Sequence, residues 1–384
     1  MQNVVMLLTN SFRPDPRVLK EATSLQTNGF KITILCWDRL ASLKSEEILP
    51  SGVKVIRIQN IHSSYGIGIR QLLRLPRFWL TVQRYLKTIK PGIIHCHDFD
   101  TLPAGLWYGL FHHIPIIYDA HEYYAQLVRP RLKGIIGWIV YSLIKIGELL
   151  GARFSSAVVT VDDSLAVIYR KQNRKVIILG HYPETRMAMQ SNPVFTRPYL
   201  ALMYAGRLSV DRGILLYADI LRELINKGIP ARLVLAGVFT PESEKTRIND
   251  YAKDVIKSID YLGWISYDQI PLFYHEADIG LAILLPEPRY VAATPVKLFE
   301  YMSSGLPVIA SNFPSIAEII NEANCGLLID PVGDLTGTIN TIQSWWQNKD
   351  TPQTLGENGR NAILTKFNWE HNIPALIDLY RELS

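Results

Sequence analysis

The sequence predicts an α/β protein with two domains, each built on a parallel β-sheet, and three observations lead to this prediction. The chain has 384 residues, which suits two or three domains of about 150 residues each. Its composition, 48% hydrophobic and 20% charged, allows a sizeable core and excludes a disordered chain. Apolar runs of strand length alternate with helical stretches throughout, which is typical of strand–helix units in parallel sheets.

The apolar runs fall into two series, one in each half of the chain. The first series predicts strands at residues 4–8, 32–36, 53–58, 92–96, 114–118, 157–161 and 175–179. The second series predicts strands at residues 200–204, 232–236, 259–262, 279–282, 307–310 and 326–329. A polar, proline-bearing segment separates the two series. We therefore predict an N-terminal domain over residues 1–185, a linker over 186–198 and a C-terminal domain over 199–366.

Both predicted domains are Rossmann-like, and this places the functional residues. In such sheets ligands bind outside the carboxyl ends of the strands, so the loops after the apolar runs are the candidate sites. With two domains, the cleft between them is the expected active site.

Charge is distributed unevenly between the two halves. Residues 1–190 carry a net charge of +11 and residues 191–384 carry −6. The basic half would suit nucleic acid or an anionic membrane, although scattered surface charge is the simpler alternative. We find no motif that is typical of nucleic-acid binding, so no nucleic-acid partner is expected.

Two segments of the basic half suggest a membrane surface. Residues 65–90 interleave basic side chains with leucine, phenylalanine, tryptophan and tyrosine, which indicates an interfacial element. Residues 129–153 contain an uncharged stretch of 11 residues, 134–144, short of the ~20 needed to span a bilayer. This second segment could lie in the interface or be a buried helix.

The cysteines and the N-terminus suggest a cytoplasmic protein. Three cysteines lie far apart, which excludes a disulfide framework or a structural zinc site and suits a reducing compartment. The first residues carry a short apolar run without a charged segment, and we interpret them as a strand rather than a signal peptide.

Candidate chemistry in the first half follows three predicted strands. Asp15 is expected to cap a helix that Pro16 begins, and its amides could face an anion or belong simply to a well-capped helix. Residues 95–100 suggest a metal cluster, but neighbouring side chains on a strand point to opposite faces, so no metal is expected. His121 follows Asp119 at a strand end, where it is placed for proton or hydrogen-bond chemistry. No GxGxxG is present at the first strand, which disfavours nicotinamide or flavin cofactors.

Two arginines follow the first strand of the second half. Arg207 comes just past this strand and Arg212 just before the next helix. Guanidinium groups that bracket a strand-to-helix loop suit a diphosphate, and ordinary ion pairing is the alternative.

The segment ATPVKLFEYMSSG predicts a phosphate-binding helix start. We expect Thr294 to be the N-cap and Pro295 the first helical residue, so that the free amides come from Val296 and Lys297. A phosphate there would meet these amides, the positive end of the helix dipole and the Lys297 ammonium. Glu300 lies one to two turns further, where its carboxylate could accept hydrogen bonds from a ribose diol.

Together these motifs resemble the retaining, nucleotide-sugar-dependent glycosyltransferases of family 4, which have the GT-B fold. In order they are DPRVLKEA, IIHCHD, YDAHE, YAGRL with a following RG, YLGWIS and KLFEYMSSGLPVIAS, and they extend along nearly the whole chain. Residues 367–384 are similar to the last helix of that family, which crosses back onto the first domain.

The resemblance implies a role for each matching residue. His121 would lie by the donor sugar and its leaving phosphate, Arg207 and Arg212 would hold the diphosphate, and Glu300 would bind the ribose. Gly206, Thr294, Val296, Lys297, Trp264 and Ile265 would complete the donor site, and Asp15 and Arg17 would lie on the acceptor side. Two positions depart from the family: Ala292 stands where a glutamate contacts the donor sugar, and Asn10–Phe12 replace a glycine pair.

These implications define the expected function. We predict a configuration-retaining hexosyltransferase that needs no metal or other cofactor and acts on a nucleotide-diphosphate sugar, with UDP-glucose favoured and GDP-mannose next. The acceptor would be lipid-linked or a polysaccharide, and the protein would be peripheral on the inner face of the plasma membrane. A nucleotide-sugar epimerase of the same fold and a non-catalytic sugar-nucleotide or nucleic-acid binding protein are the alternatives.

Overall fold

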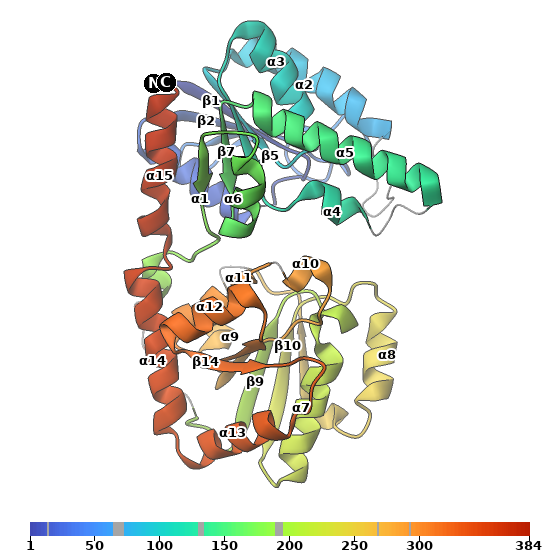
Figure 1. Ribbon diagram of the computed structural model, residues 1–384, viewed down its shortest axis with the longest axis vertical. Helices are drawn as coiled ribbons and strands as arrows, with labels where there is room; N and C mark the ends of the chain where they lie inside the picture. Colours follow the sequence, from blue (N-terminus) through green and yellow to red (C-terminus); the bar gives the residue numbers. More distant parts are fainter. Residues whose placement is uncertain (14, 64–72, 130–133, 189–194, 267–268, 292) are drawn as a thin grey trace. The chain divides into compact units, whose positions relative to one another are not determined.

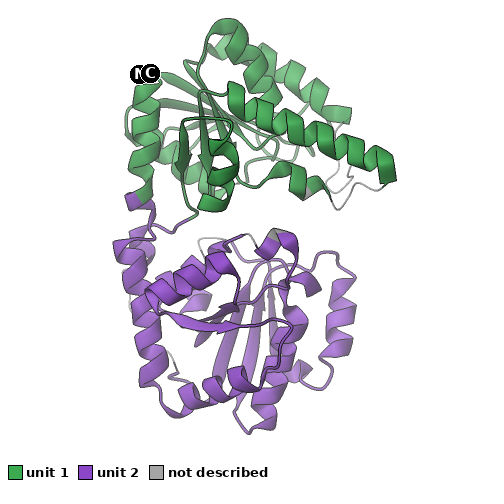
Figure 2. Cartoon of the chain, in the orientation of Figure 1, with its two compact units in different colours: residues 1–181, 372–384 green, residues 182–371 purple. Residues whose placement is uncertain are grey.

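The computed structural model describes the chain except residues 14, 64–72, 130–133, 189–194, 267–268 and 292 (Figure 1). The chain divides into two compact units, unit 1 with residues 1–181 and 372–384 and unit 2 with residues 182–371 (Figure 2). The segment predicted as a linker, residues 186–198, is assigned to unit 2. Its residues Ala188 and Phe195 are buried in the core of that unit.

Unit 1 is built on a sheet in which the described residues form eight strands, in the order β3-β4-β2-β1-β5-β6-β7-β8. Seven of them are parallel and confirm the seven runs predicted as strands. Strand β3 was not predicted; it pairs antiparallel with β4 and is too short and acidic to show an apolar run. The bounds are β1 Asn3–Leu8, β2 Lys31–Trp37, β3 Glu46–Ile48, β4 Lys54–Ile58, β5 Ile93–His97, β6 Ile116–Ala120, β7 Ala157–Thr160 and β8 Val176–Ile178.

The helices of unit 1 cover this sheet and include the end of the chain. They are α1 Pro16–Thr27, α2 Leu75–Ile89, α3 Leu102–His112, α4 Tyr124–Val128, α5 Gly134–Phe154 and α6 Asp163–Arg170, together with most of α15, Trp369–Glu382. Helix α15 is held to unit 1 by the buried Tyr380, which packs edge-on against Phe30, and by an ion pair between Lys175 and Glu382. The sequence prediction that the last helix packs on the N-terminal domain is confirmed.

Unit 2 contains, within the residues described, a fully parallel sheet of six strands in the order β11-β10-β9-β12-β13-β14. The strands are β9 Leu200–Ala205, β10 Ala231–Ala236, β11 Ile259–Gly263, β12 Ile279–Ala282, β13 Val308–Ser311 and β14 Gly326–Ile329. The helices are α7 Ile214–Asn226, α8 Glu244–Tyr251, α9 Ile270–Tyr274, α10 Pro288–Val291, α11 Val296–Ser303, α12 Pro314–Ala323, α13 Thr336–Gln347 and α14 Asp350–Thr365, with short 3-10 turns at Thr185–Ala188, Val210–Arg212 and Ile256–Ser258.

Both sheets are doubly wound, and their strand orders locate the ligand edge. In unit 1 the strands that follow β1 are first added on one side of it, beginning with β2, and then on its other side, beginning with β5. In unit 2 the strands are added in the same way around β9, beginning with β10 on one side and with β12 on the other. The crevice at the carboxyl ends of strands next to such a change of side is where open α/β sheets bind ligands.

The structure corrects part of the membrane interpretation of residues 65–90, of which 65–72 lie outside the described residues. Helix α2 turns its apolar face inward, where Phe78 is fully buried, and the Trp79 indole donates a hydrogen bond to the Asp100 carbonyl oxygen. Phe78 therefore belongs to the core. Exposed Arg77 and Arg84 remain on the outer face of the helix.

Helix α5 is long and apolar enough, by length and composition, to cross a membrane. One face nevertheless packs on unit 1, because the buried Glu148 accepts hydrogen bonds from the hydroxyls of Tyr118 and Tyr169 and from the amides of Tyr124 and Ala125. The opposite face is exposed and apolar, with Ile135, Ile136, Trp138, Ile139, Leu143, Ile146 and Leu150. Helix α5 is thus a surface helix of unit 1 with an uncovered apolar face.

Candidate active site

A buried charged cluster lies at the carboxyl edge of the unit 1 sheet. Asp15 caps α1 as predicted, accepting from the Arg17 and Val18 amides, and Pro16 is its first helical residue. Arg17 then points into the unit, where its guanidinium pairs with Glu21 at 2.8 Å and with Asp119 at 2.5 Å. Both ion pairs lie inside unit 1, and the Arg17 side chain is buried. The sequence had suggested that Arg17 lies on the acceptor side, where it would have to be accessible.

Three imidazoles surround the second oxygen of Asp119. Asp119 Oδ2 lies 3.2 Å from His97 Nδ1, 3.4 Å from His121 Nε2 and 3.5 Å from His95 Nε2. Strand geometry explains why two of these imidazoles lie together: His95 and His97 are two residues apart on β5, so their side chains project from the same face of the sheet. The predicted catalytic residue His121 is thus built into a network of buried polar groups.

The electrostatics of the cluster keep His121 charged. Burial and Arg17 lower the pKa of His121, but the carboxylates Asp98 and Asp119 outweigh them and raise this pKa to about 9. Burial opposes ionisation of Asp119, yet Arg17 and His121 hold the pKa of its carboxyl well below the usual range. At neutral pH His121 is therefore an imidazolium, which can stabilise negative charge but cannot serve as a base.

Glu21, His95, His97 and Asp119 each offer an atom within 4.8 Å of the others, as a metal site would require. One observation disfavours an ion at this place: both carboxylates are already engaged by Arg17. The His95 and His97 rings are stacked, with centroids 4.4 Å apart and planes 8° apart. The arrangement suits charge sharing among side chains.

A hollow of about 360 Å³ lies beside this cluster, between β1 and α1, and is lined by Asn10, Ser11, Phe12, Arg13, Asp15 and Pro16. Phe12 adopts a left-handed backbone conformation with φ of +46°, which glycine adopts far more readily. This is the place where the resemblance leads us to expect a glycine pair. The Phe12 side chain is buried and narrows the space that glycines would leave open.

In unit 2 the first candidate residues meet at the end of β9. Gly206 has φ of +140°, and a Cβ atom at this position would lie 2.4 Å from Cε and 2.5 Å from Nζ of Lys297. The Lys297 ammonium also lies 5.6 Å from the centre of the Tyr204 ring. Glycine is therefore needed for Lys297 to approach the end of β9. Burial is the main cause that lowers the pKa of Lys297, and Glu300 opposes it.

The two arginines of this unit share one tyrosine. Arg207 donates to Asp211 at 2.7 Å and to the Tyr290 hydroxyl at 3.0 Å, and the Arg212 guanidinium lies 5.1 Å from the Tyr290 ring centre. Tyr290 was not singled out from the sequence, because nothing in the local pattern marks it. Arg207 and Arg212 thus stand together at the carboxyl edge, and Arg207 makes the ordinary ion pair, with Asp211, that was the alternative to binding a diphosphate. The diphosphate role of the two arginines stays a prediction.

Helix α11 begins one residue later than predicted. It starts at Val296 with Pro295 in the cap position and extended backbone, so Thr294 is not the N-cap; the fixed ring of Pro295 supplies the cap geometry instead. Leu298 is the first amide to bond back, to the Pro295 carbonyl oxygen, and the Val296 and Lys297 amides precede it. Glu300 accepts a hydrogen bond of 2.6 Å from the Tyr274 hydroxyl, which fixes the carboxylate that we predicted to bind a ribose.

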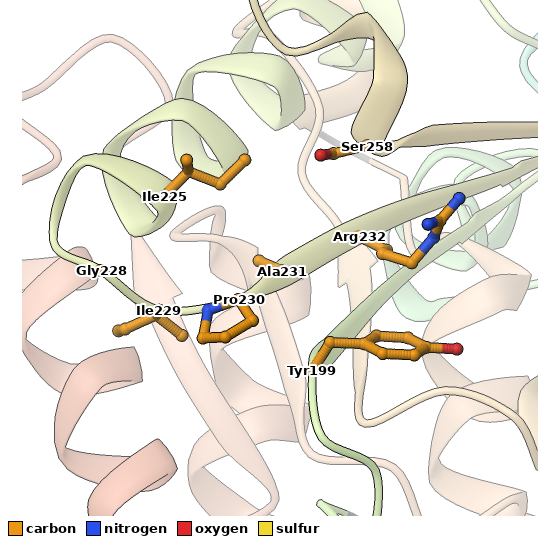
Figure 3. Close-up of a pocket in the computed structure, with 8 residues that line it drawn as sticks. All are labelled: Tyr199, Ile225, Gly228, Ile229, Pro230, Ala231, Arg232 and Ser258. Carbon is orange, nitrogen blue, oxygen red and sulfur yellow. The ribbon is translucent and has the colours of Figure 1, made fainter.

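The remaining predicted donor residues follow β11. Trp264 is 74% exposed, whereas Ile265 packs on the core of unit 2. Ala292 lies outside the described residues. A second hollow, of about 440 Å³, lies at the amino ends of β9 and β10, where Tyr199, Arg232 and Ser258 line it (Figure 3). It is therefore at the edge of the sheet opposite the candidate residues.

His95, His97 and Asp100 lie in the segment 95–100 that the sequence marked as a possible metal cluster, whereas Glu21 and Tyr380 were not singled out. Glu21 could have been found from its four-residue spacing to Arg17 on one helix. Tyr380 could not, because its hydroxyl reaches His95 Nδ1, at 2.5 Å, across 285 positions of sequence. Asp100 is a further buried carboxyl; burial and Asp98 raise its pKa to about 7, although the Thr9 hydroxyl donates to it.

Comparison with solved structures shows the fold class. Sucrose-phosphate synthase from Thermosynechococcus elongatus superposes with a TM-score of 0.79 at 18% identity, covering 100% of this chain and 99% of that one. Anabaena Alr3699/HepE in complex with UDP and glucose superposes with a TM-score of 0.72 at 14% identity, covering 100% of both chains. With two doubly wound sheets, the protein has the GT-B glycosyltransferase fold.

Sequence comparison gives the family. Residues 17–180 match the family described as Glycosyltransferase Family 4, and residues 188–362 match Glycosyl transferases group 1. The chain belongs to the family 4 glycosyltransferases.

Two curated relatives show how far the similarity extends. A lipopolysaccharide 1,2-N-acetylglucosaminetransferase of Salmonella typhimurium is 28% identical over 196 residues, about half (49%) of either chain. A GDP-mannose-dependent alpha-(1-6)-phosphatidylinositol dimannoside mannosyltransferase of Mycobacterium tuberculosis is 26% identical over 298 residues, 74% of this chain and 72% of that one.

Proposed function

We propose that this protein is a retaining glycosyltransferase that moves a hexose from a nucleotide-diphosphate sugar to a lipid-linked or polysaccharide acceptor. The observation that carries the proposal is the set of cationic groups at the carboxyl edge of unit 2. Lys297 lies over Gly206, and Arg207 and Arg212 share Tyr290. Three cations at the start of a helix and the end of a strand suit the two phosphates of a nucleotide sugar.

The charges define what the protein would contribute to the reaction. As the bond between the sugar and the phosphate breaks, negative charge grows on the departing nucleoside diphosphate. Fixed cations stabilise this charge, which is the usual task of a metal ion, so we propose that the reaction needs none. The His121 imidazolium of unit 1 would act on the same leaving group, and Glu300, held by Tyr274, would bind the ribose.

The donor and acceptor are inferred from the relatives. UDP and glucose are bound in the Anabaena structure, and GDP-mannose is named as the donor of the mycobacterial relative. We favour a UDP-hexose, such as UDP-glucose, with GDP-mannose as the second choice. A lipopolysaccharide and a phosphatidylinositol dimannoside appear in the names of the two curated relatives, which supports a saccharide or lipid-linked acceptor.

Nucleotide binding should depend on Lys297. We expect one of UDP, GDP, dTDP and ADP, each at about 1 mM, to raise the melting temperature of the protein. A ligand at 100 times its dissociation constant stabilises the folded state by ~2.7 kcal/mol. In Lys297→Met the shift should fall to a small fraction, because the phosphates lose a cation at the helix start.

The matched control is Lys253→Met, which removes an exposed ammonium from the same unit. This variant should keep the full nucleotide shift. Equal shifts in the Lys297→Met and Lys253→Met proteins, or no shift with any nucleotide, would contradict the proposed donor site.

We also propose that unit 1 binds an anionic membrane surface as a peripheral protein, on the inner face of the plasma membrane. The exposed apolar face of α5 and the exposed arginines of α2 are the two features that an interfacial element combines. Each basic residue near an anionic surface contributes ~1 kcal/mol to binding. The triple change of Arg74, Arg77 and Arg84 to Glu should therefore abolish cosedimentation with phosphatidylglycerol vesicles.

The control for this experiment is Arg247→Glu, an exposed charge reversal on α8 in unit 2. It should sediment as the unchanged protein does. Nucleotide shifts should be the same in both variants, which separates membrane binding from donor binding. Unchanged sedimentation of the triple variant would overturn the membrane proposal.

A further inference from the structure

We propose that Asp119 is a positioning residue for the transfer reaction, which keeps His121 an imidazolium with Nε2–H turned into the protein and Nδ1–H turned outward. The inference rests on the proposed function and deepens it, because it assigns the group that prepares His121 to stabilise an anionic leaving group.

Asp119 contacts His121 from the buried side of the imidazole ring. It is the fourth residue of β6, its side chain is fully buried, and His121 follows two positions later, just past the strand. Arg17 takes Oδ1, which leaves Oδ2 to face His121 Nε2 at 3.4 Å. The carboxylate therefore attracts a proton on Nε2 of His121.

His95, another imidazole near Oδ2, lies between Tyr380 and Asp119: its Nδ1 is 2.5 Å from the Tyr380 hydroxyl and its Nε2 is 3.5 Å from Asp119 Oδ2. Burial and His97 lower the pKa of His95, which favours its neutral form. His97 Nδ1 lies 3.2 Å from His121 Nε2 and 3.2 Å from Asp119 Oδ2, so it belongs to the same group of contacts.

The outward side of His121 remains accessible. Its Nδ1 lies 3.9 Å from an oxygen of Asp98, whose side chain is 41% exposed, and the His121 side chain itself is 19% exposed. Nδ1 thus lies on the side of the partly exposed Asp98, where an anion from solvent could reach it, while Nε2 faces the buried Asp119.

The titratable groups that face His121 come from every element around it. They are Arg17 from α1, His97 from β5, Asp98 after β5, Asp119 from β6 and His181 after β8. His181 is neutral, because burial, Arg17 and His121 hold its pKa well below the ordinary value, and its Nε2 lies 3.0 Å from Arg17 Nη1. The charge on His121 is therefore set by burial and Arg17, which oppose it, and by the carboxylates of Asp98 and Asp119, which favour it.

Asp119→Asn keeps the shape of the side chain and removes its charge. An opposite charge within about 4–6 Å shifts a pKa by about one to three units. The alkaline limb of the pH profile of nucleoside diphosphate release should therefore move toward acid by about one to three pH units. Activity at pH 8 should fall about tenfold relative to pH 6, whereas the unchanged protein should be equally active at both. Recovery of activity on acidification is not expected of a merely structural residue.

The control is Asp163→Asn, an exposed carboxylate at the start of α6, which should leave the profile where it is. A second measurement does not require that the Asp119 variant folds. The histidine nitrogens of the unchanged protein are titrated by NMR, and the His121 signal is assigned as the one that is missing in His121→Asn. The signal should titrate near pH 9, with Nε2–H protected from exchange.

The outcomes separate this inference from the proposed function. Titration of His121 near 6.5, or equal loss of activity at pH 6 and pH 8 in Asp119→Asn, overturns the positioning role. Titration near 9 with a downward shift in Asp119→Asn supports it, even if no nucleotide sugar is consumed; in that case the proposed function alone fails.

Discussion

Arg17→Met is expected to destabilise unit 1 by about 3–5 kcal/mol, the usual result of removing one partner from a buried ion pair. Arg17 is almost fully buried, and both of its partners, Glu21 and Asp119, are fully buried. The methionine fills a similar volume but leaves Glu21 without its ion pair and Asp119 with only the His121 imidazolium as a cation. Denaturant unfolding at pH 7, followed by circular dichroism, measures the loss.

The loss of stability in Arg17→Met should depend on pH in a definite direction. Arg17 and His121 hold the pKa of Asp119 well below its ordinary value, so the pairing stabilises the fold above the unfolded value of about 3.9. This stability is lost as the pH falls through the lower, folded pKa. The difference between Arg17→Met and the unchanged protein should therefore narrow at acidic pH, because a protonated carboxyl needs no cation.

Arg13→Met is the matched control for the Arg17 variant. Arg13 lies four residues earlier and is exposed, with a hydrogen bond to the exposed hydroxyl of Ser42. Its replacement should change the free energy of unfolding by less than about 0.5 kcal/mol. If the Arg17 and Arg13 variants are equally stable at pH 7, the buried cluster is not charged as described.

His121→Asn is expected to lower the rate of transfer by about 10²–10³ while nucleotide binding changes little. Loss of a single preorganised donor to a developing anion has an effect of this size. Asparagine keeps a hydrogen-bond donor of similar reach but no positive charge, and nucleotide binding depends on unit 2. Release of nucleoside diphosphate from the preferred donor measures the rate, and the thermal shift measures binding.

His113→Asn controls for the change of residue type, since His113 is an exposed histidine at the end of α3. It should be fully active. A His121→Asn protein that retains more than a third of the activity would show that His121 is not the cation of the reaction.

The fold was predictable because each local signal in this chain agrees with the tertiary structure. All thirteen apolar runs became strands, within one or two residues, since a strand buried on both faces has to be continuously apolar. Strand β3 was missed because it pairs along the edge with acidic residues. The start of α11 was placed one residue early, because a proline can occupy the cap as well as the first turn.

The sequence could place a candidate site residue only where a short local pattern suffices. His121 and Arg207 each follow a strand and Lys297 begins a helix, and their roles stay predictions. The residues that tune them come from distant segments: Tyr380 reaches His95 from the last helix, and Tyr290 joins the two arginines from α10. Such long-range contacts leave no pattern in a single sequence. For helix α2 the local pattern misled the prediction. Its apolar face was assigned to a membrane surface but packs in the core, because the same amphipathic pattern is found in both kinds of helix.

Consumption of a nucleotide sugar by the purified protein tests the central claim most directly. UDP-glucose, GDP-mannose and related donors would each be incubated with the protein and a saccharide-lipid extract, and nucleoside diphosphate measured. We expect release from one donor, in the presence of a metal chelator, with loss in the Glu300→Ala protein. A folded protein that releases nucleoside diphosphate from none of the donors, or releases it equally in Glu300→Ala, would contradict the account.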